Sequence, residues 1–110
     1  MNFALSNKGN WAGSNTSVSY NDSTNCSSVF LHGHRIATFD HNLKALKISS
    51  CGYETVTTKS RLNALCEEFC VDGEGVFQKN FKWFVRKFAG QNGTEKVFVN
   101  VEFQSGYIFN

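Results

Sequence analysis

The apolar and polar positions between residues 59 and 69 predict one amphipathic helix. Four apolar side chains recur there at i, i+3, i+4 and i+7, on one face of a 3.6-residue period: Leu62, Leu65, Cys66 and Phe69. Thr57 and Thr58 precede them, where a hydroxyl oxygen can accept hydrogen bonds from first-turn N–H groups. Asp72-Gly73 provides a stop signal. We therefore expect a helix with one buried face.

Short apolar runs before this helix predict a meander of three strands. Residues 29–32 and 35–39 flank Gly33-His34, a two-residue loop of the Gly-first kind that suits a tight hairpin. Asp40-His41-Asn42 turns the chain again, and residues 45–50 follow as the third strand.

Alternation resumes after the helix. Residues 76–78 are predicted as a short strand. A turn at Lys79-Asn80 then leads into a longer strand at residues 81–88. Asn92-Gly93 is the strongest hairpin signal, so residues 96–103 should pair with residues 81–88. A last strand at residues 107–109 is expected at a sheet edge. These elements predict an α+β fold: an antiparallel sheet of about six strands with one amphipathic helix packed on one face.

The first 27 residues differ in composition from the rest of the chain. Ser, Asn, Gly and Thr dominate them, and apolar residues are isolated. We expect a Ser/Asn-rich N-terminal arm at residues 1–27, with a short strand near residues 17–20, and a single α+β domain at residues 28–110. A length of 110 residues fits one domain.

Composition and charge predict the cellular compartment of the protein better than its function. A net charge of +2 is too small to identify a nucleic-acid partner by itself. No apolar run reaches the roughly 18 residues of a spanning helix, and the first residues lack the pattern of a signal peptide. We therefore expect a cytoplasmic protein with no membrane partner. The cysteines of such a protein are expected as free thiols rather than two disulfides: Cys26, Cys51, Cys66 and Cys70.

The charges of the predicted helix oppose its dipole. Lys59 and Arg61 lie at the positive N-terminal end, whereas Glu67 and Glu68 lie at the negative end. A bound anion among the threonine hydroxyls and the two cations would compensate. The alternative, which we favour, is neutralisation by Glu54 or solvation of both ends.

The segment QKNFKWFVRKF, residues 78–88, which contains the predicted strand at residues 81–88, combines cations with aromatic rings. Four cations and no acid lie between Val76 and Thr94: Lys79, Lys82, Arg86 and Lys87. In an extended strand, one face carries Phe81, Trp83 and Val85, and the other carries Lys82, Phe84, Arg86 and Phe88. Rings that stack on bases and cations that meet phosphates suit single-stranded nucleic acid. The alternative is a strand with both faces partly covered and its cations at the rim.

Metal and enzyme chemistry have weaker support. His32 and His34 with Cys66 and Cys70 allow a tetrahedral zinc site to be drawn, but no CxxC pair is present. No spacing selects a nucleophile and a base, and no phosphate-binding loop or paired carboxylates occur. We expect no enzyme activity, no metal and no cofactor.

Three segments, LHGHRIA, CGYETVTTKSRLNAL and VFQKNFKWFV, together resemble a group of small tailed-phage and prophage proteins. The shared pattern is LHGxxIA, then TTKxRLNxL, then QKxxxWF, and the match spans residues 31–85. The resemblance implies a phage accessory protein of a domain-of-unknown-function family with no assigned catalysis. This chain departs from the pattern at His34, at Cys51 and in its tail after Gly90. The matching positions include Thr57, Thr58, Lys59, Arg61, Asn63, Gln78, Lys79 and Trp83.

These observations support two hypotheses. The first is a non-enzymatic phage accessory protein in the host cytoplasm that binds nucleic acid, with Trp83 or Phe84 as a stacking ring. If the helix start and the cationic strand share one side, they form a single basic surface; Arg61 and Lys79 on opposite faces would exclude it. The alternative is an inhibitor or modulator of a host enzyme or antiviral defence complex, which strand addition at residues 103–109 could serve. The expected nucleic-acid or partner-binding residues are Thr57, Thr58, Lys59, Arg61, Lys79, Lys82, Trp83, Phe84 and Arg86.

Overall fold

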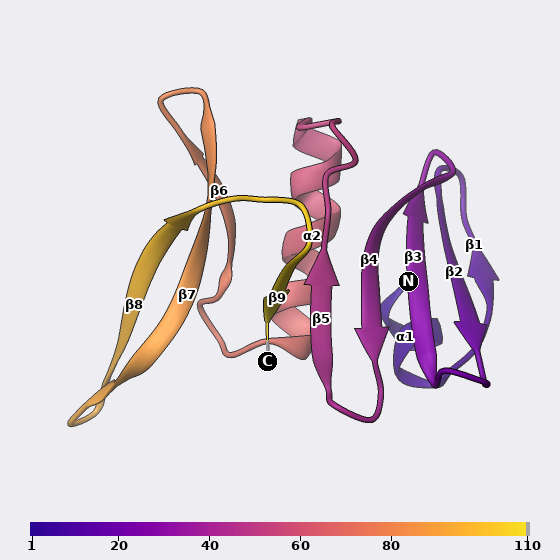
Figure 1. The fold of residues 1–110 in the computed structure, drawn as a ribbon, viewed down its shortest axis with the longest axis horizontal. Helices are drawn as coiled ribbons and strands as arrows, with labels where there is room; N and C mark the ends of the chain where they lie inside the picture. Colours follow the sequence, from indigo (N-terminus) through magenta and orange to yellow (C-terminus); the bar gives the residue numbers. More distant parts are fainter. Residues whose placement is uncertain (110) are drawn as a thin grey trace.

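A computed structural model describes residues 1–109 and places two antiparallel sheets around one long helix (Figure 1). The helices are α1 (Asn2–Ser6) and α2 (Val56–Phe69). The strands are β1 (Trp11–Ala12), β2 (Thr16–Asn21), β3 (Cys26–Leu31), β4 (His34–Asp40), β5 (Ala45–Ile48), β6 (Gly75–Lys79), β7 (Lys82–Asn92), β8 (Glu95–Glu102) and β9 (Tyr107–Phe109).

The predicted α+β class is confirmed, and the strands divide into two sheets rather than one. The larger sheet has six strands in the order β1-β2-β3-β4-β5-β9. The smaller sheet has three strands in the order β6-β7-β8. In Figure 1 the helix α2 lies beside the smaller sheet and behind β5 and β9 of the larger one. The C-terminal strand β9 crosses back to pair with β5, at Leu46↔Phe109 and its neighbours.

The N-terminal segment takes part in the larger sheet. Residues 1–27, expected as an arm, supply α1, β1 and β2. β2 pairs with β3 over six positions, from Thr16↔Leu31 to Asn21↔Cys26. Leu5 and Val18 are buried in the main hydrophobic core. Backbone pairing of β2 and a few buried apolar side chains therefore hold this polar segment on the larger sheet.

Helix α2 begins earlier than its sequence pattern suggests. Thr55 is the N-cap, and its Oγ1 accepts a hydrogen bond from the Thr58 backbone N–H at 3.2 Å. The cap predicted at Thr57 or Thr58 is wrong, because Thr58 lies inside the first turn with its side chain buried. The predicted apolar face is buried at Leu62, Leu65 and Cys66. The helix ends at Phe69, before Asp72-Gly73, and Cys70 is its C-cap.

The two-residue turns lie one residue away from their predicted positions. The β3–β4 turn is His32-Gly33, with φ of 51° and 79°, rather than Gly33-His34. The β6–β7 turn is Asn80-Phe81, with φ of 52° and 63°, rather than Lys79-Asn80. Two successive positive φ angles match the twist of the flanking strands, which is why they are favoured in tight hairpins. The predicted pairing of residues 96–103 with 81–88 is confirmed, with a bulge between Phe88 and Gly90.

A side-chain amide joins α2 to the smaller sheet. Asn63 Nδ2 donates to the Val76 carbonyl oxygen at 2.8 Å, and the Val76 N–H donates to Asn63 Oδ1 at 2.7 Å. The amide thus bonds to the β6 backbone as a neighbouring strand would. A Cβ atom at Gly75 would lie 2.6 Å from Asn63 Oδ1, so glycine leaves room for this contact. Val76, Trp83 and Val85 then enter the same core as Leu62 and Leu65.

Replacing Asn63 should destabilise the protein through this contact. Asn63→Ala leaves a backbone N–H and C=O of β6 without their partners, which should lower the free energy of unfolding by about 1–3 kcal/mol. Urea denaturation measures this change, with Ser60→Ala at an exposed position of α2 as the control. An Asn63→Ala variant as stable as Ser60→Ala would contradict the structural role of the amide.

The variant Gly75→Ala should act through the same hydrogen bonds. Its added methyl group displaces the Asn63 amide, so the double variant Asn63→Ala/Gly75→Ala should be little less stable than either single variant. A double-mutant cycle by urea denaturation measures the coupling. Additive losses would show that Gly75 and Asn63 act independently.

Candidate nucleic-acid interface

The smaller sheet has one face toward the core and one face away from it. The inner face carries Val76, Trp83 and Val85, which are buried. The pairs Gly75↔Arg86, Phe77↔Phe84 and Lys79↔Lys82 lie on the opposite side, called here the outer face. On β8, the outer face continues with Lys96, Phe98, Asn100 and Glu102.

The outer face alternates rings with cations across the strands. The Phe77 and Phe84 rings stack with centroids 5.6 Å apart and planes at 22°. The Arg86 guanidinium carbon lies 4.4 Å from the centroid of the Phe98 ring. Such a cation over a ring face is held by the ring quadrupole, and its polar edge remains available.

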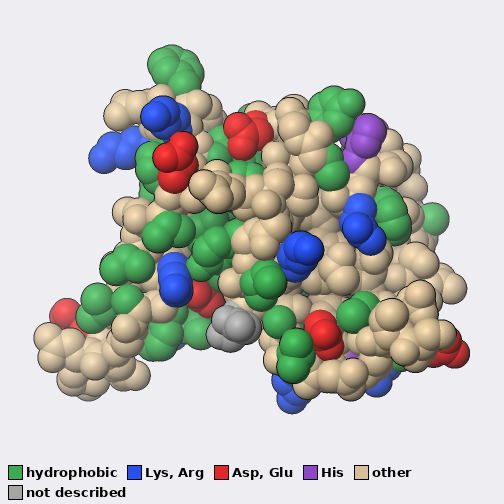
Figure 2. Space-filling model, viewed as in Figure 1, with side chains coloured by type: hydrophobic (Ala, Val, Ile, Leu, Met, Phe, Trp, Pro, Cys, Tyr) green, Lys and Arg blue, Asp and Glu red, His purple; other side chains and the backbone are tan. Residues whose placement is uncertain are grey.

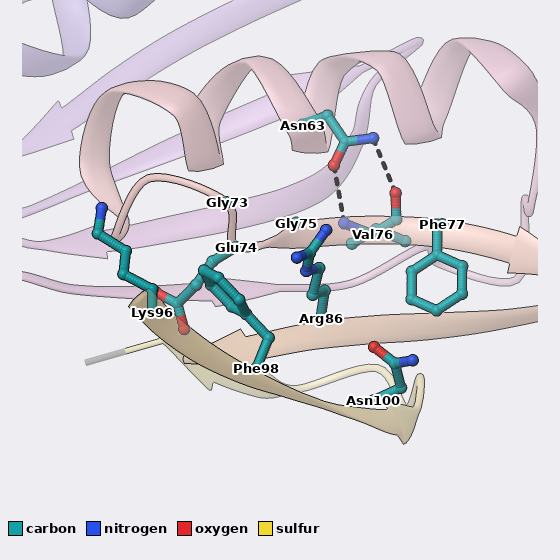
Figure 3. Close-up of a pocket in the computed structure, with 10 residues that line it drawn as sticks. All are labelled: Asn63, Gly73, Glu74, Gly75, Val76, Phe77, Arg86, Lys96, Phe98 and Asn100. Atoms are coloured by element: carbon teal, nitrogen blue, oxygen red, sulfur yellow. Dashed lines mark hydrogen bonds between the residues drawn. The ribbon is translucent and has the colours of Figure 1, made fainter. Parts of the chain in front are cut away.

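An open groove of about 560 Å³ runs from α2 across this face (Figure 3). Its volume falls within the usual range for ligand sites. Figure 3 shows the Arg86 side chain in the middle of the groove, with Phe77 on one side and Phe98 on the other. The groove is lined by Asn63, Gly73, Glu74, Gly75, Val76, Phe77, Arg86, Lys96, Phe98 and Asn100.

The loop before β6 forms one wall of the groove. Glu74 Oε2 accepts a hydrogen bond from the Phe88 N–H at 2.9 Å, and Oε1 accepts one from the Val71 N–H at 3.0 Å. A Cβ atom at Gly73 would lie 2.6 Å from the Phe98 ring, so this glycine packs directly on the ring. The carboxylate of the groove is thus bonded to backbone N–H groups, whereas Arg86 and Lys96 contribute positive charge.

Phe81 is exposed at the tip of the β6–β7 hairpin. Its exposed fraction is 96%, and its φ of 63° lies in the left-handed region that a bulky residue rarely adopts. Lys79 and Lys82 flank the turn. The sequence interpretation placed Phe81 inside a strand and missed this position. The preceding Asn80 was the available signal, because asparagine tolerates the left-handed region of such turns.

Four of the predicted residues of the basic strand lie together on the outer face: Lys79, Lys82, Phe84 and Arg86. Trp83 lies on the inner face with 4% of its surface exposed, and its ring centroid is 5.5 Å from that of Phe103. The tryptophan ring is therefore part of the core, which leaves Phe84 of the two expected stacking rings on the exposed side.

The helix start does not join this surface. Arg61 Nε donates to Thr16 Oγ1 at 3.1 Å, and Nη2 donates to Asn15 Oδ1 at 3.5 Å, so Arg61 faces the larger sheet. Asn63, two residues along the helix, faces the smaller sheet. The hypothesis of a single basic surface therefore fails at Arg61, whose guanidinium bonds to residues of the larger sheet and the loop before it. Figure 2 likewise shows Lys and Arg side chains spread over both sheets on the face in view.

The start of α2 borders a different cavity. Thr57 and Thr58 line a space of about 370 Å³ beside the β3–β4 hairpin. His32, His34 and Tyr53 also line it, and the His34 and Tyr53 ring centroids are 4.6 Å apart. Lys59, at the half-buried start of the helix, does not line either cavity.

The four cysteines are free thiols: Cys26, Cys51, Cys66 and Cys70. A hydrogen bond with the Cys70 thiol and then burial raise the pKa of Cys66. Burial, followed by the nearby Glu74 charge, raises the pKa of Tyr107. Within residues 1–109, no three His, Cys, Asp or Glu side chains lie close enough together to hold a metal ion. None of the helices described there is long and apolar enough to cross a membrane.

The fold and the groove define a small α+β protein whose second, three-stranded sheet carries a cationic and aromatic face. The family model of the Kyanoviridae Gp96 protein matches residues 1–110. The chain therefore belongs to the Kyanoviridae Gp96 family, a phage protein family, which confirms the expected phage origin. No curated protein and no solved structure matches this chain.

The cysteines should differ in reactivity toward an alkylating agent. Cys51 is exposed, whereas Cys66 is buried and its raised pKa keeps it protonated. In the folded protein, iodoacetamide should modify Cys66 at least about tenfold more slowly than Cys51. Mass spectrometry of labelled peptides measures both rates. Equal rates in the folded state, matching those in urea, would contradict the burial of Cys66.

Proposed function

We propose that this phage protein is a non-enzymatic accessory protein that binds single-stranded nucleic acid through the outer face of its three-stranded sheet. The observation that carries the proposal is the alternation of rings and cations in register across the sheet. Phe77 lies opposite Phe84, and Lys79 lies opposite Lys82. Arg86 lies over Phe98 on the adjacent strand.

This arrangement offers the two interactions that single strands use. Exposed aromatic rings stack on bases without regard to sequence, and cations beside them neutralise phosphates. The groove around Arg86 has room for a base, and Asn100 at its edge can both donate and accept hydrogen bonds. Phe81 at the hairpin tip adds a ring with no covering side chains on most of its surface.

The alternative, a modulator of a host protein, relied on strand addition at residues 103–109. In the structure, β9 pairs with β5 on one side and is the last strand of the larger sheet on the other, and the Phe103 and Phe109 rings are buried. With these two rings in the core, the segment offers little aromatic surface to an added strand, and we favour the nucleic-acid proposal. Recovery of a host protein from nuclease-treated lysate would instead favour the alternative.

Binding should depend on salt and on the outer-face cations. For a single strand, the logarithm of the association constant falls with the logarithm of salt concentration by about 0.7 per phosphate contact. The variant Lys82→Ala/Arg86→Ala should therefore bind a labelled oligothymidine more weakly and lower this slope by about 1.4. Fluorescence anisotropy measures both quantities.

The matched control is Lys47→Ala, which removes an exposed cation from the larger sheet. It should leave the slope unchanged. Equal slopes for all three proteins, or no binding of any DNA or RNA strand at low salt, would contradict the proposal.

Replacing Phe81 by glycine should weaken nucleic-acid binding without lowering the stability of the fold. Glycine accepts a φ of 63° without strain, so Phe81→Gly should keep the free energy of unfolding level or raise it by up to about 1 kcal/mol. Loss of a stacking ring should cost about 1–3 kcal/mol of binding free energy. Anisotropy and urea denaturation on the same samples measure the two effects. Unchanged affinity would exclude Phe81 from the interface.

A further inference from the structure

Strand β8 has one free edge. It is the last strand of the order β6-β7-β8, and no other strand among residues 1–109 pairs with its second edge. It spans eight residues and lies at the periphery of the molecule (Figure 1). Unpaired N–H and C=O groups along such an edge are a template for another strand.

The usual features that block edge pairing are missing from the centre of β8. The chain contains no proline. The bulge between Phe88 and Gly90 lies on β7, so β8 itself runs without interruption. Its charged residues, Glu95, Lys96 and Glu102, are confined to the two ends.

The valines of β8 form an exposed stripe. Val97, Val99 and Val101 have exposed fractions of 43%, 44% and 36%. They alternate with Phe98 and Asn100, which line the groove on the outer face. The centre of the strand is therefore apolar on the side away from the groove.

The hydrogen-bonding pattern selects which residues can bond a new strand. The Phe103 N–H donates to the Trp83 carbonyl oxygen at 3.0 Å, toward β7. Because backbone direction alternates along a strand, odd-numbered residues of β8 bond toward β7. Lys96, Phe98, Asn100 and Glu102 then direct their backbone groups to the free edge.

We infer that β8 pairs antiparallel with β8 of a second copy of this chain, across a two-fold axis at Val99. This register places Val97 opposite Val101 and Phe98 opposite Asn100. It also places Lys96 opposite Glu102 on both sides of the axis. All free-edge residues then oppose free-edge residues, as ladder hydrogen bonds require.

Charge complementarity favours this register over a shifted one, and it favours a second copy of the chain as the partner. A shift of two residues would place Lys96 opposite Asn100 or Gln104 and leave both charges without an opposite partner. In the inferred register, opposite charges face each other and three valine pairs form, which is favourable for cross-strand neighbours. An edge that complements itself in charge, side chain and bonding pattern fits a second copy of itself. The product is a six-stranded sheet with two adjacent outer faces, independent of whether nucleic acid binds there.

Charge reversal tests the inference on the full chain. Lys96→Glu and Glu102→Lys should each raise the dimer dissociation constant at least tenfold, and the double variant should return it to within about threefold of the wild type. Sedimentation equilibrium measures these constants, with Lys44→Glu in the β4–β5 turn as a charge-matched control. A wild type that stays monomeric at about 100 µM protein, or a double variant that dimerises more weakly than both single variants, would overturn the inference.

A cysteine at the two-fold axis gives a second, independent measurement. Opposed residues of a non-hydrogen-bonded pair have Cα atoms about 4.5 Å apart, within reach of a disulfide. In a Cys51→Ser background, Val99→Cys should form a 99–99 disulfide under mild oxidation, seen on non-reducing gels and by peptide mapping. Asn100→Cys should not, because Phe98 opposes it. Equal crosslinking of both variants, or of neither, would also overturn the inference.

Discussion

The pair of hydrogen bonds between the Asn63 amide and the Val76 backbone is the contact on which the arrangement of the two sheets depends. It joins a helix that packs on the larger sheet to the edge strand of the smaller one. A helix cannot continue a β ladder with its own backbone, because its N–H and C=O groups are already paired internally. A side-chain amide supplies one donor and one acceptor instead. Gly75 keeps the space that this amide needs.

This attachment leaves one face of the smaller sheet uncovered. Val76, Trp83 and Val85 turn into the shared core, so the rings and cations at alternate positions point away from it. The loop containing Gly73 and Glu74 packs against one side of that outer face, and the groove lies between this loop and the strands. The same alternation that builds the core therefore builds the candidate binding surface.

Periodicity in the sequence predicted the elements better than their assembly. The face of α2 and the pairing of β7 with β8 followed from spacing alone, since a 3.6-residue period and an Asn-Gly turn are local signals. The direction of Arg61 was not predictable, because a helical period gives an apolar face but not the element that each polar side meets. Trp83 was misassigned as an exposed ring for a similar reason: alternation separates the two faces of a strand without saying which one is buried. Phe81 was missed because the β6–β7 turn lies one residue later in the chain than predicted.

The most direct measurement is a backbone amide NMR titration of the isotope-labelled protein with oligothymidine at low salt. If the outer face of the smaller sheet is the binding surface, shift changes will concentrate on β6, β7 and β8, including Phe77, Phe84 and Arg86, and will fade as salt is added. Changes centred on the larger sheet, or none at any strand concentration, would contradict the assignment of this surface to nucleic acid.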